Sequence, residues 1–427
     1  MEKTNNSYKV MIVEDSPLIR GYLQRTLLMD PDIDVCAVAE NGQIALDIVK
    51  RSNPDIILLD VEMPVMDGLT ALPQLIKESP SSAVIMVSTL TSKNAAISIE
   101  ALSKGASDYV EKPSADIDKE EFKRDLISKV KAIGDSIKKK TDEEFNFLNP
   151  EKKLSLPEQF SNIKTKSDTV TEGEQLSAEK PVEQKAEYPV KEVAKSVTNL
   201  PERKSPVKPI EVKSDNPAPQ VNIANNSNNN FMNFMPDVLA IGCSTGGPQA
   251  LQEVFGIIGN SITKIPIFIT QHMPPQFTTF LAKSISSVSG AQCIEAEDGQ
   301  KIERGVVYLA PGDFHMVVKN EGGHKIVKLT QDEPENFCRP AVDPMLRSLV
   351  DVYSNRILTV IMTGMGQDGL KGAKAVHEKG GRVIIQDEAS SVVWGMPGAI
   401  ANAGFHDAVY PLNELGTKIT KICNGGL

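Results

Sequence analysis

The chain has 427 residues, a formal net charge of −10 and a sequence pI near 5.2. This length predicts two or three domains, each with its own core, and the acidic balance argues against a nucleic-acid-binding surface. Five cysteines without a Cys-x-x-Cys pair indicate a reducing compartment, with neither a disulfide framework nor a zinc site. The polar start, Met1 to Asn6, and the lack of a long apolar run predict a cytoplasmic protein without membrane insertion.

Composition divides the chain into three regions. Residues 8–140 and 236–427 alternate apolar, strand-like runs with amphipathic segments, a pattern typical of α/β domains with parallel sheets. Residues 141–235 are instead rich in Lys, Glu, Pro, Ser and Asn. Such a segment buries too little apolar surface to offset its ordering entropy. We therefore predict two folded domains joined by a long disordered linker.

Charged and hydroxyl side chains follow four predicted strands of the N-terminal domain. The strands are predicted over residues 10–13, 54–59, 83–87 and 108–111. The side chains at their carboxyl ends are Glu14, Asp15, Asp60, Ser88 and Lys112. Clustered carboxylates suit Mg²⁺, and an aspartate beside a cation and a lysine is placed to accept a phosphoryl group. The alternative is that each charged residue merely ends its own strand.

A serine between glycines marks the start of the C-terminal domain. Ser244 follows a strand-like run from Val238, and a helix is predicted over residues 248–255. Glycines in such a turn remove the Cβ atoms that would block a substrate carbonyl, and the next helix presents free N–H groups to an oxyanion. The pattern favours a hydrolytic nucleophile. The alternative is a glycine-rich turn that holds a phosphate or only connects two elements.

Two further strand-like runs end near residues that complete a catalytic triad. Residues 265–271 lead into His272, and residues 357–363 lead into a glycine-rich loop that contains Asp368. Parallel strands would bring the three side chains to one sheet edge, where open α/β folds place their sites. Ser244 would then attack, His272 would take its proton, and Asp368 would orient the imidazole. The alternatives are a structural histidine and an aspartate that caps a helix starting near residue 370.

Residues 8–140 resemble two-component receiver domains. Glu14-Asp15 stands at the family's acidic pair, and Asp60 stands at the phosphoacceptor in Leu-Asp-Val-Glu-Met-Pro-Val-Met-Asp-Gly. The resemblance implies a flavodoxin-like, doubly wound parallel sheet. It also implies Mg²⁺ held by Glu14, Asp15 and Asp60, phosphorylation of Asp60 by a chemotaxis histidine kinase, and a conformational switch. The switch residues that it implies are Ser88, Tyr109 and Lys112.

Residues 236–427 resemble the catalytic domain of chemotaxis protein-glutamate methylesterases. The motifs that carry this resemblance are Ile-Gly-Cys-Ser-Thr-Gly-Gly, Gln-His-Met-Pro, Leu-Ala-Pro-Gly-Asp-Phe-His-Met, Arg-Pro-Ala-Val-Asp and Met-Thr-Gly-Met-Gly-Gln-Asp-Gly. It implies a Rossmann-like, doubly wound α/β domain with Ser244, His272 and Asp368 as the triad. The backbone at Met365 is expected in the oxyanion hole.

The same resemblance implies the reaction. The substrate would be a glutamate γ-methyl ester on a chemoreceptor, hydrolysed to glutamate and methanol, with glutamine deamidation by the same route. We expect a monomer, with phosphorylation of the receiver regulating the esterase and with no cofactor in the esterase domain.

Several residues carry alternatives. Cys243 stands where the family has a smaller residue, and we expect its thiol to point away from Ser244 rather than to act as the nucleophile. His315 either lines the site or is a core histidine. Arg339 and Asp343 likewise either line the site or have a structural role. Arg339 is a candidate to contact an acidic receptor helix.

Two other classes of protein remain open. One is a response regulator whose output domain binds DNA or acts as a scaffold, although the chain is acidic and has no basic helix. The other is a nucleotide-binding α/β enzyme with residues 242–247 as its phosphate loop. That loop lacks the Lys-Ser/Thr pair of a P-loop.

Overall fold

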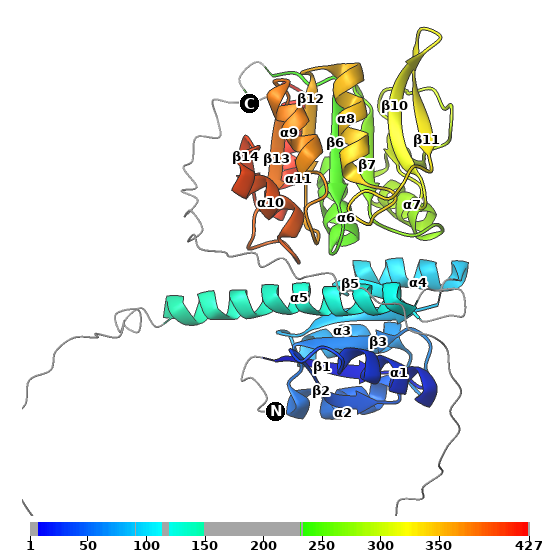
Figure 1. Ribbon diagram of the computed structural model, residues 1–427, viewed down its shortest axis with the longest axis vertical. Helices are drawn as coiled ribbons and strands as arrows, with labels where there is room; N and C mark the ends of the chain where they lie inside the picture. The colour runs from blue at the N-terminus through cyan, green and yellow to red at the C-terminus, as the bar shows by residue number, and fades with distance from the viewer. Residues whose placement is uncertain (1–6, 90, 113–118, 149–230, 232–233, 426–427) are drawn as a thin grey trace, which may run out of the picture. The chain divides into compact units, whose positions relative to one another are not determined.

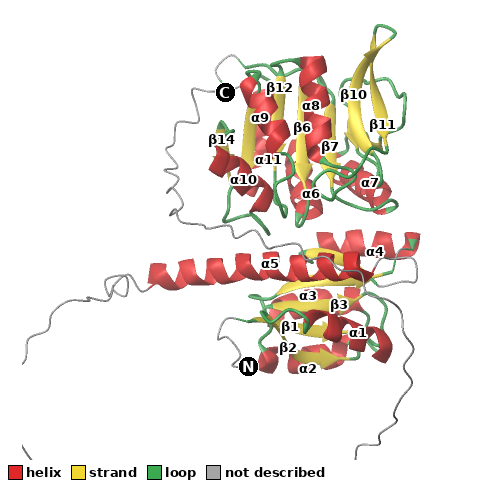
Figure 2. Ribbon diagram, viewed as in Figure 1, coloured by secondary structure: helices red, strands yellow, loops and turns green. Residues whose placement is uncertain are grey.

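The computed structural model describes residues 7–89, 91–112, 119–148, 231 and 234–425 (Figure 1). Most of the predicted linker, residues 141–235, therefore lies outside the described residues. Two α/β regions flank it, and in both regions helices lie on the two faces of a parallel sheet (Figure 2). The predicted fold class is confirmed.

The N-terminal region contains a five-stranded parallel sheet in the order β2-β1-β3-β4-β5. Its strands are β1 (Tyr8–Val13), β2 (Ile33–Ala39), β3 (Ile56–Asp60), β4 (Ala83–Ser88) and β5 (Asp108–Glu111). Its helices are α1 (Pro17–Leu27), α2 (Gly42–Ser52), α3 (Gly68–Glu78), α4 (Ser92–Ser103) and α5 (Lys119–Leu148). Helices α1 and α5 pack on one face of the sheet, and α2, α3 and α4 pack on the other.

Local signals explain where these elements begin. The Ser16 hydroxyl accepts a hydrogen bond from the Ile19 N–H at 3.5 Å, with Pro17 at the first helical position, so α1 begins where the sequence predicts. Asn41 and Asp67 cap α2 and α3 in the same way. Helix α5 continues to Leu148, eight residues beyond the boundary expected at residue 140.

The C-terminal region is built on a seven-stranded parallel sheet in the order β14-β13-β12-β6-β7-β9-β8. Its strands are β6 (Val238–Cys243), β7 (Ile267–Gln271), β8 (Cys293–Glu295), β9 (Val307–Leu309), β12 (Ile357–Ile361), β13 (Arg382–Gln386) and β14 (Ala408–Tyr410). An antiparallel hairpin is added by β10 (His315–Glu321) and β11 (His324–Thr330).

Six helices cover the two faces of this sheet. They are α6 (Gly247–Ile258), α7 (Phe277–Ser289), α8 (Val342–Tyr353), α9 (Leu370–Glu378), α10 (Gly395–Ala403) and α11 (Leu412–Cys423). Helices α6, α7 and α11 pack on one face, and α8, α9 and α10 pack on the other. The central strands β6, β7 and β12 are buried along their whole length, which explains their continuous apolar sequences.

Two features of the described residues bear on the expectations. Phe231, near the end of the predicted linker, is buried among apolar side chains. None of the described helices is both long and apolar enough to cross a membrane.

Candidate functional site

The three predicted triad residues follow neighbouring strands of the larger sheet. Strand β6 lies between β7 and β12. Ser244 directly follows β6, His272 directly follows β7, and Asp368 lies in the loop between β12 and α9. Because all three strands run parallel, these residues reach the same carboxyl-terminal edge.

The turn that carries Ser244 is held from both sides. The Ser244 N–H donates to the Thr363 carbonyl at 3.0 Å, and the Gly247 N–H donates to the Ser244 carbonyl at 2.7 Å. Gly364 passes so close that a Cβ on it would lie 2.8 Å from the Ser244 Cβ. Glycine is therefore required where the loop after β12 meets the serine.

His272 and Asp368 form a hydrogen-bonded pair at this edge of the sheet. The His272 Nε2 lies 2.7 Å from the Asp368 Oδ2, and the two residues are 96 positions apart in the chain. The His272 side chain is 11% exposed and that of Asp368 is 1% exposed. Among the hydrogen bonds of the described residues, none joins Ser244 to His272. The structure thus brings His272 and Asp368 into contact and places Ser244 at the end of the strand beside β7.

Asp368 is surrounded by donors. Its carboxylate accepts hydrogen bonds from the backbone N–H groups of Val342 at 2.6 Å, Asp343 at 3.2 Å and Gly369 at 2.9 Å. Two of these groups belong to the first turn of α8, so the carboxylate lies at the positive end of a helix. Burial raises the pKa of Asp368, but His272 and these backbone donors outweigh it and lower the pKa below its usual value.

The environment of His272 favours its protonated form. Burial lowers the pKa of His272, but Cys338 and Asp368 raise it by more than burial lowers it. The net result is a pKa of about 10. The Cys338 Sγ lies 3.4 Å from the His272 Nδ1. The two ring nitrogens thus face different groups, Nε2 facing Asp368 and Nδ1 facing Cys338.

Sequence reasoning missed Cys338, Asn336 and Gln271. The Asn336 side-chain amide donates to the Asp368 Oδ1 at 3.0 Å. The Gln271 amide donates to the Ser244 carbonyl at 3.0 Å and so helps to fix the nucleophile turn. Gln271 ends a predicted strand, which was a usable signal. The loop that contains Asn336 and Cys338 gave none, because no regular element precedes it.

The residues left open by the sequence have defined partners. The buried His315 accepts a hydrogen bond at Nδ1 from the Ala341 N–H, and its Nε2 lies 3.2 Å from the Glu333 carbonyl. It is therefore a bonded core histidine. Arg339 pairs with Asp313 at 2.6 Å.

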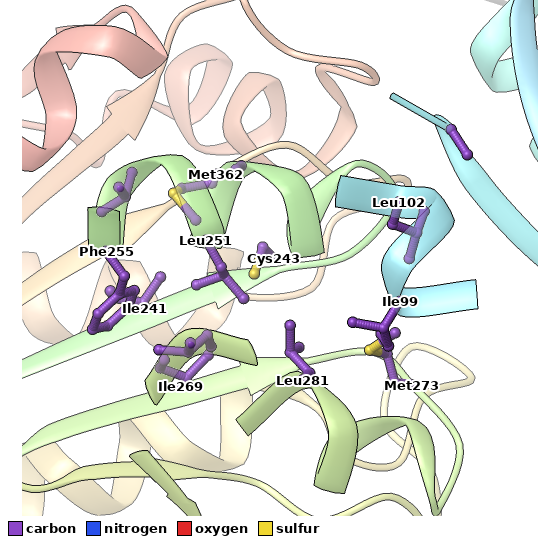
Figure 3. Packing of buried hydrophobic residues seen from close by; sticks show 14 of the residues in the cluster. Ile99, Leu102, Ile241, Cys243, Leu251, Phe255, Ile269, Met273, Leu281 and Met362 are labelled. Atoms are coloured by element: carbon purple, nitrogen blue, oxygen red, sulfur yellow. The ribbon is translucent and has the colours of Figure 1, made fainter. Parts of the chain in front are cut away.

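Cys243 points into the core rather than toward the catalytic edge. It is fully buried among apolar side chains that include Leu251 and Ile269 (Figure 3). Burial raises the pKa of its thiol well above the usual value. A thiol in this environment is not ionised near neutral pH, which argues against a cysteine nucleophile at this position.

The Met365 backbone lies one residue after the close approach of Gly364 to Ser244. Among the hydrogen bonds of the described residues, none uses the Met365 N–H as donor. The role of this N–H group in an oxyanion hole stays a prediction.

The receiver-like sheet gathers a second set of functional residues. Glu14 follows β1, Asp60 ends β3, and both side chains are buried. The Lys112 Nζ lies 2.7 Å from the Asp60 Oδ2 and 3.0 Å from the Glu14 Oε2. The Ser88 hydroxyl, also buried, donates to the Thr89 carbonyl at 3.3 Å.

The acidic group fits a divalent cation. Ligand oxygens of Glu14, Asp15 and Asp60 lie within 4.8 Å of one another. The buried Glu14 Oε2 and Asp60 Oδ2 share the ammonium group of Lys112. Burial raises the pKa of Asp60 despite Lys112, and burial together with Asp60 raises that of Glu14. A hard cation would satisfy these oxygens.

The fold and the two sites are typical of a receiver domain joined to a hydrolase domain with a doubly wound parallel sheet. Comparison with known proteins agrees. Residues 10–122 match the response regulator receiver domain family, and residues 239–419 match the CheB methylesterase family.

Relatives match nearly the whole chain. A protein-glutamate methylesterase/protein-glutamine glutaminase of Rhodospirillum centenum is 44% identical over 421 residues, covering 98% of this chain and 94% of its own. One from Azospirillum brasilense is 44% identical over 423 residues, covering 97% and 93%. The CheB methylesterase catalytic domain of Thermotoga maritima is a similar solved structure. It has 39% identity and a TM-score of 0.43, covering 44% of this chain and 98% of its own.

The chain therefore belongs to the family of protein-glutamate methylesterases/protein-glutamine glutaminases, as its sequence motifs predict. It is an ester hydrolase with a response-regulator receiver domain.

Proposed function

We propose that the protein hydrolyses glutamate γ-methyl esters on chemoreceptors, with Ser244 as nucleophile, His272 as base and Asp368 as its partner. The observation that carries this proposal is the contact between His272 and Asp368 on the strand ends that flank Ser244. We further propose that the enzyme works in the cytoplasm, where the receptor helices that carry these esters lie.

The chemistry follows from the positions of the protons. Ser244 Oγ attacks the ester carbonyl while its proton passes to Nδ1 of a neutral His272, and Asp368 stabilises the imidazolium through Nε2. The tetrahedral oxyanion accepts a hydrogen bond from the Met365 N–H. When the intermediate collapses, the methoxide takes the proton from His272 and leaves as methanol. Water then repeats the cycle and releases glutamate. A glutamine side chain reacts in the same way and releases ammonia.

For the receiver we propose Mg²⁺-dependent phosphorylation of Asp60 by a chemotaxis histidine kinase. Glu14, Asp15 and Asp60 would hold the cation, which neutralises the oxygens of the transferring phosphoryl group. Lys112, which already contacts Asp60 and Glu14, would pair with the phosphoryl oxygens. The close grouping of these three carboxylates, with only one lysine facing the two buried ones, supports this proposal.

We propose that this phosphorylation raises esterase activity. The supporting observation lies within the receiver. Ser88 and Tyr109 are buried on β4 and β5, the two strands that follow β3 and its Asp60 across the sheet. A phosphoryl group on Asp60 would change the surroundings of these two side chains, and a receiver that switches between two states can regulate an attached domain.

The decisive experiment measures methanol release from a methylated receptor. Ser244→Ala should lower turnover by about 10³-fold or more, and a His272 variant should cost a similar amount because triad members act as a unit. Cys243→Ala is the matched control, since its thiol lies in the core. Near-normal turnover in Ser244→Ala together with loss in Cys243→Ala would show that the nucleophile is wrongly assigned.

A further inference from the structure

A tight turn at residues 335–338 lies against the acid–base pair. The Cys338 N–H donates to the Glu335 carbonyl at 2.9 Å, and the Glu335 N–H donates back to the Cys338 carbonyl at 3.2 Å. The two central residues, Asn336 and Phe337, have φ values of 52° and 63°. This left-handed conformation is tolerated by asparagine but strained for phenylalanine. Such strain persists only where surrounding contacts fix the backbone.

The ends of the turn are fixed to the C-terminal domain. His315 contacts the Glu333 carbonyl and accepts from the Ala341 N–H, so one buried side chain holds both flanks of the turn. Arg339 adds its pair with Asp313 and a hydrogen bond to the Asp332 carbonyl at 3.1 Å. The turn is therefore a rigid support and not a free loop.

The side chain of Asn336 lies between two buried carboxylates. Its Nδ2 is 3.0 Å from the Asp368 Oδ1 and 3.3 Å from the Asp343 Oδ2. Both aspartates are 1% exposed. Their negative charges repel each other: burial and then Asp368 raise the pKa of Asp343. An NH₂ group supplies two donors and no charge, so it satisfies both oxygens at once.

The same turn reaches His272 through Cys338, whose sulfur lies 3.4 Å from Nδ1. Asn336 thus acts on the oxygen of Asp368 that does not face the imidazole, leaving the Oδ2 for Nε2. A carboxylate fixed at one oxygen cannot rotate its other oxygen away from the histidine.

We propose that Asn336 is a positioning residue, whose amide holds the Asp368 carboxylate toward His272 and shields it from Asp343. The inference rests on the proposed catalytic role of the His272–Asp368 pair. It assigns Asn336 no contact with the substrate. Loss of the amide should therefore lower kcat and leave KM unchanged.

Two substitutions in the full-length chain separate the amide from the backbone that carries it. Asn336→Gly removes the amide but keeps a residue that prefers positive φ. Asn336→Asp keeps the shape but places a third carboxylate beside two others. Phe337→Gly is the matched control, because it relieves the strained φ in the same turn and leaves Asn336 in place.

The free energy of a hydrogen bond to a charged group corresponds to about a 10- to 100-fold change in rate. We therefore expect kcat to fall by that factor in Asn336→Gly. The kcat of Asn336→Asp should be lower still, and the kcat of Phe337→Gly should equal that of the natural enzyme. KM should stay constant in all three. An unchanged kcat in Asn336→Gly, or an equal loss in Phe337→Gly, would overturn the proposal. If Asn336→Asp does not fold, the Asn336→Gly result decides.

Proton NMR of the hydrogen bond between His272 Nε2 and Asp368 gives a second readout. We expect its resonance to shift or broaden in both Asn336 variants and to persist in Phe337→Gly. This signal reports on the pair even if Ser244 is not the nucleophile, so failure of the positioning role is distinguishable from failure of the triad. A fall in kcat with an unshifted resonance would also count against Asn336 acting through Asp368.

Discussion

Two buried aspartates, one in each domain, show how the same side chain is adapted to different chemistry. Asp60 ends β3 of the smaller sheet and Asp368 follows β12 of the larger one, and each is 1% exposed. Burial raises the pKa of Asp60 above its usual value. The pKa of Asp368 is lowered, although burial acts on it in the same direction.

The difference lies in the donors that surround each carboxylate. Asp368 accepts from three backbone N–H groups, from Asn336 and from His272. Asp60 accepts one N–H, from Glu62 at 3.4 Å, and lies beside Glu14 and Lys112. Five donors compensate the charge of Asp368, whereas at Asp60 a single lysine is shared between two buried carboxylates. Burial alone therefore does not decide how a carboxylate functions.

The largest expected effect comes from removing the charge of Asp368. Asp368→Asn should lower kcat by about 10³- to 10⁴-fold, because an amide does not hold the imidazole in the productive tautomer. Steady-state methanol release measures it. Asp60→Asn, assayed without a phosphodonor, is the control and should show no comparable loss. Equal losses in the two variants would erase the distinction between the two aspartates.

The next effect concerns regulation through Asp60. With Mg²⁺ and a small phosphodonor, the full-length enzyme should gain activity, whereas Asp60→Asn and the 236–427 fragment should not respond. The fragment should be folded and active. A linker of roughly 95 residues lowers the effective concentration of the receiver, so we expect a gain near 5-fold, at the low end of typical couplings.

Identical rates for the three proteins, unchanged by the phosphodonor, would remove the regulatory role and leave the esterase assignment intact. An inactive fragment that recovers only when residues 141–235 are added back would contradict the view that this segment has no part in the chemistry.

A further effect is expected in the pH dependence of the rate. The pKa of His272, raised to about 10, means that the ring is protonated near neutrality and cannot accept the serine proton. The rate should therefore rise as pH increases from 7 toward 10. Cys338→Ala removes one of the two groups that raise this pKa, so its profile should move to lower pH. A pH–rate series on both enzymes checks this, and superimposable profiles would exclude the thiol as a determinant.

The smallest effect is on stability and has opposite signs in the two domains. Without Mg²⁺, Asp60→Asn should stabilise the receiver by about 1 kcal/mol, because it removes a buried charge that faces Glu14. Asp368→Asn should destabilise the esterase domain by at least as much. The new NH₂ group is a donor and cannot accept the hydrogen bonds that backbone N–H groups now donate to the carboxylate. Because the pKa of Asp368 is lowered, its stabilising contribution is present above the usual aspartate range and is lost as pH falls through the lowered value. Thermal unfolding of each variant measures these two changes in stability. If both substitutions stabilise or both destabilise, the contrast between Asp60 and Asp368 is wrong.

Much of the fold was predictable because it depends on short-range patterns. Apolar runs of strand length gave β1, β3, β6 and β12 within two residues, and Ser16 with Pro17 marked the start of α1. The acidic residues and Ser244 stood out because each follows such a run. The boundary expected at residue 140 falls inside α5, since residues 141–144 are polar like the segment that follows the helix.

The sequence alone determined the residue types at the strand ends, and from these the two domains and the family. Only the tertiary structure decided that β6 lies between β7 and β12 and that the first turn of α8 compensates Asp368. It also decided that Cys338, 66 positions from His272, contacts the imidazole. Periodicity and capping act over a few residues and can be read from the sequence. Hydrogen bonds between distant segments depend on how whole elements pack, which no local pattern encodes.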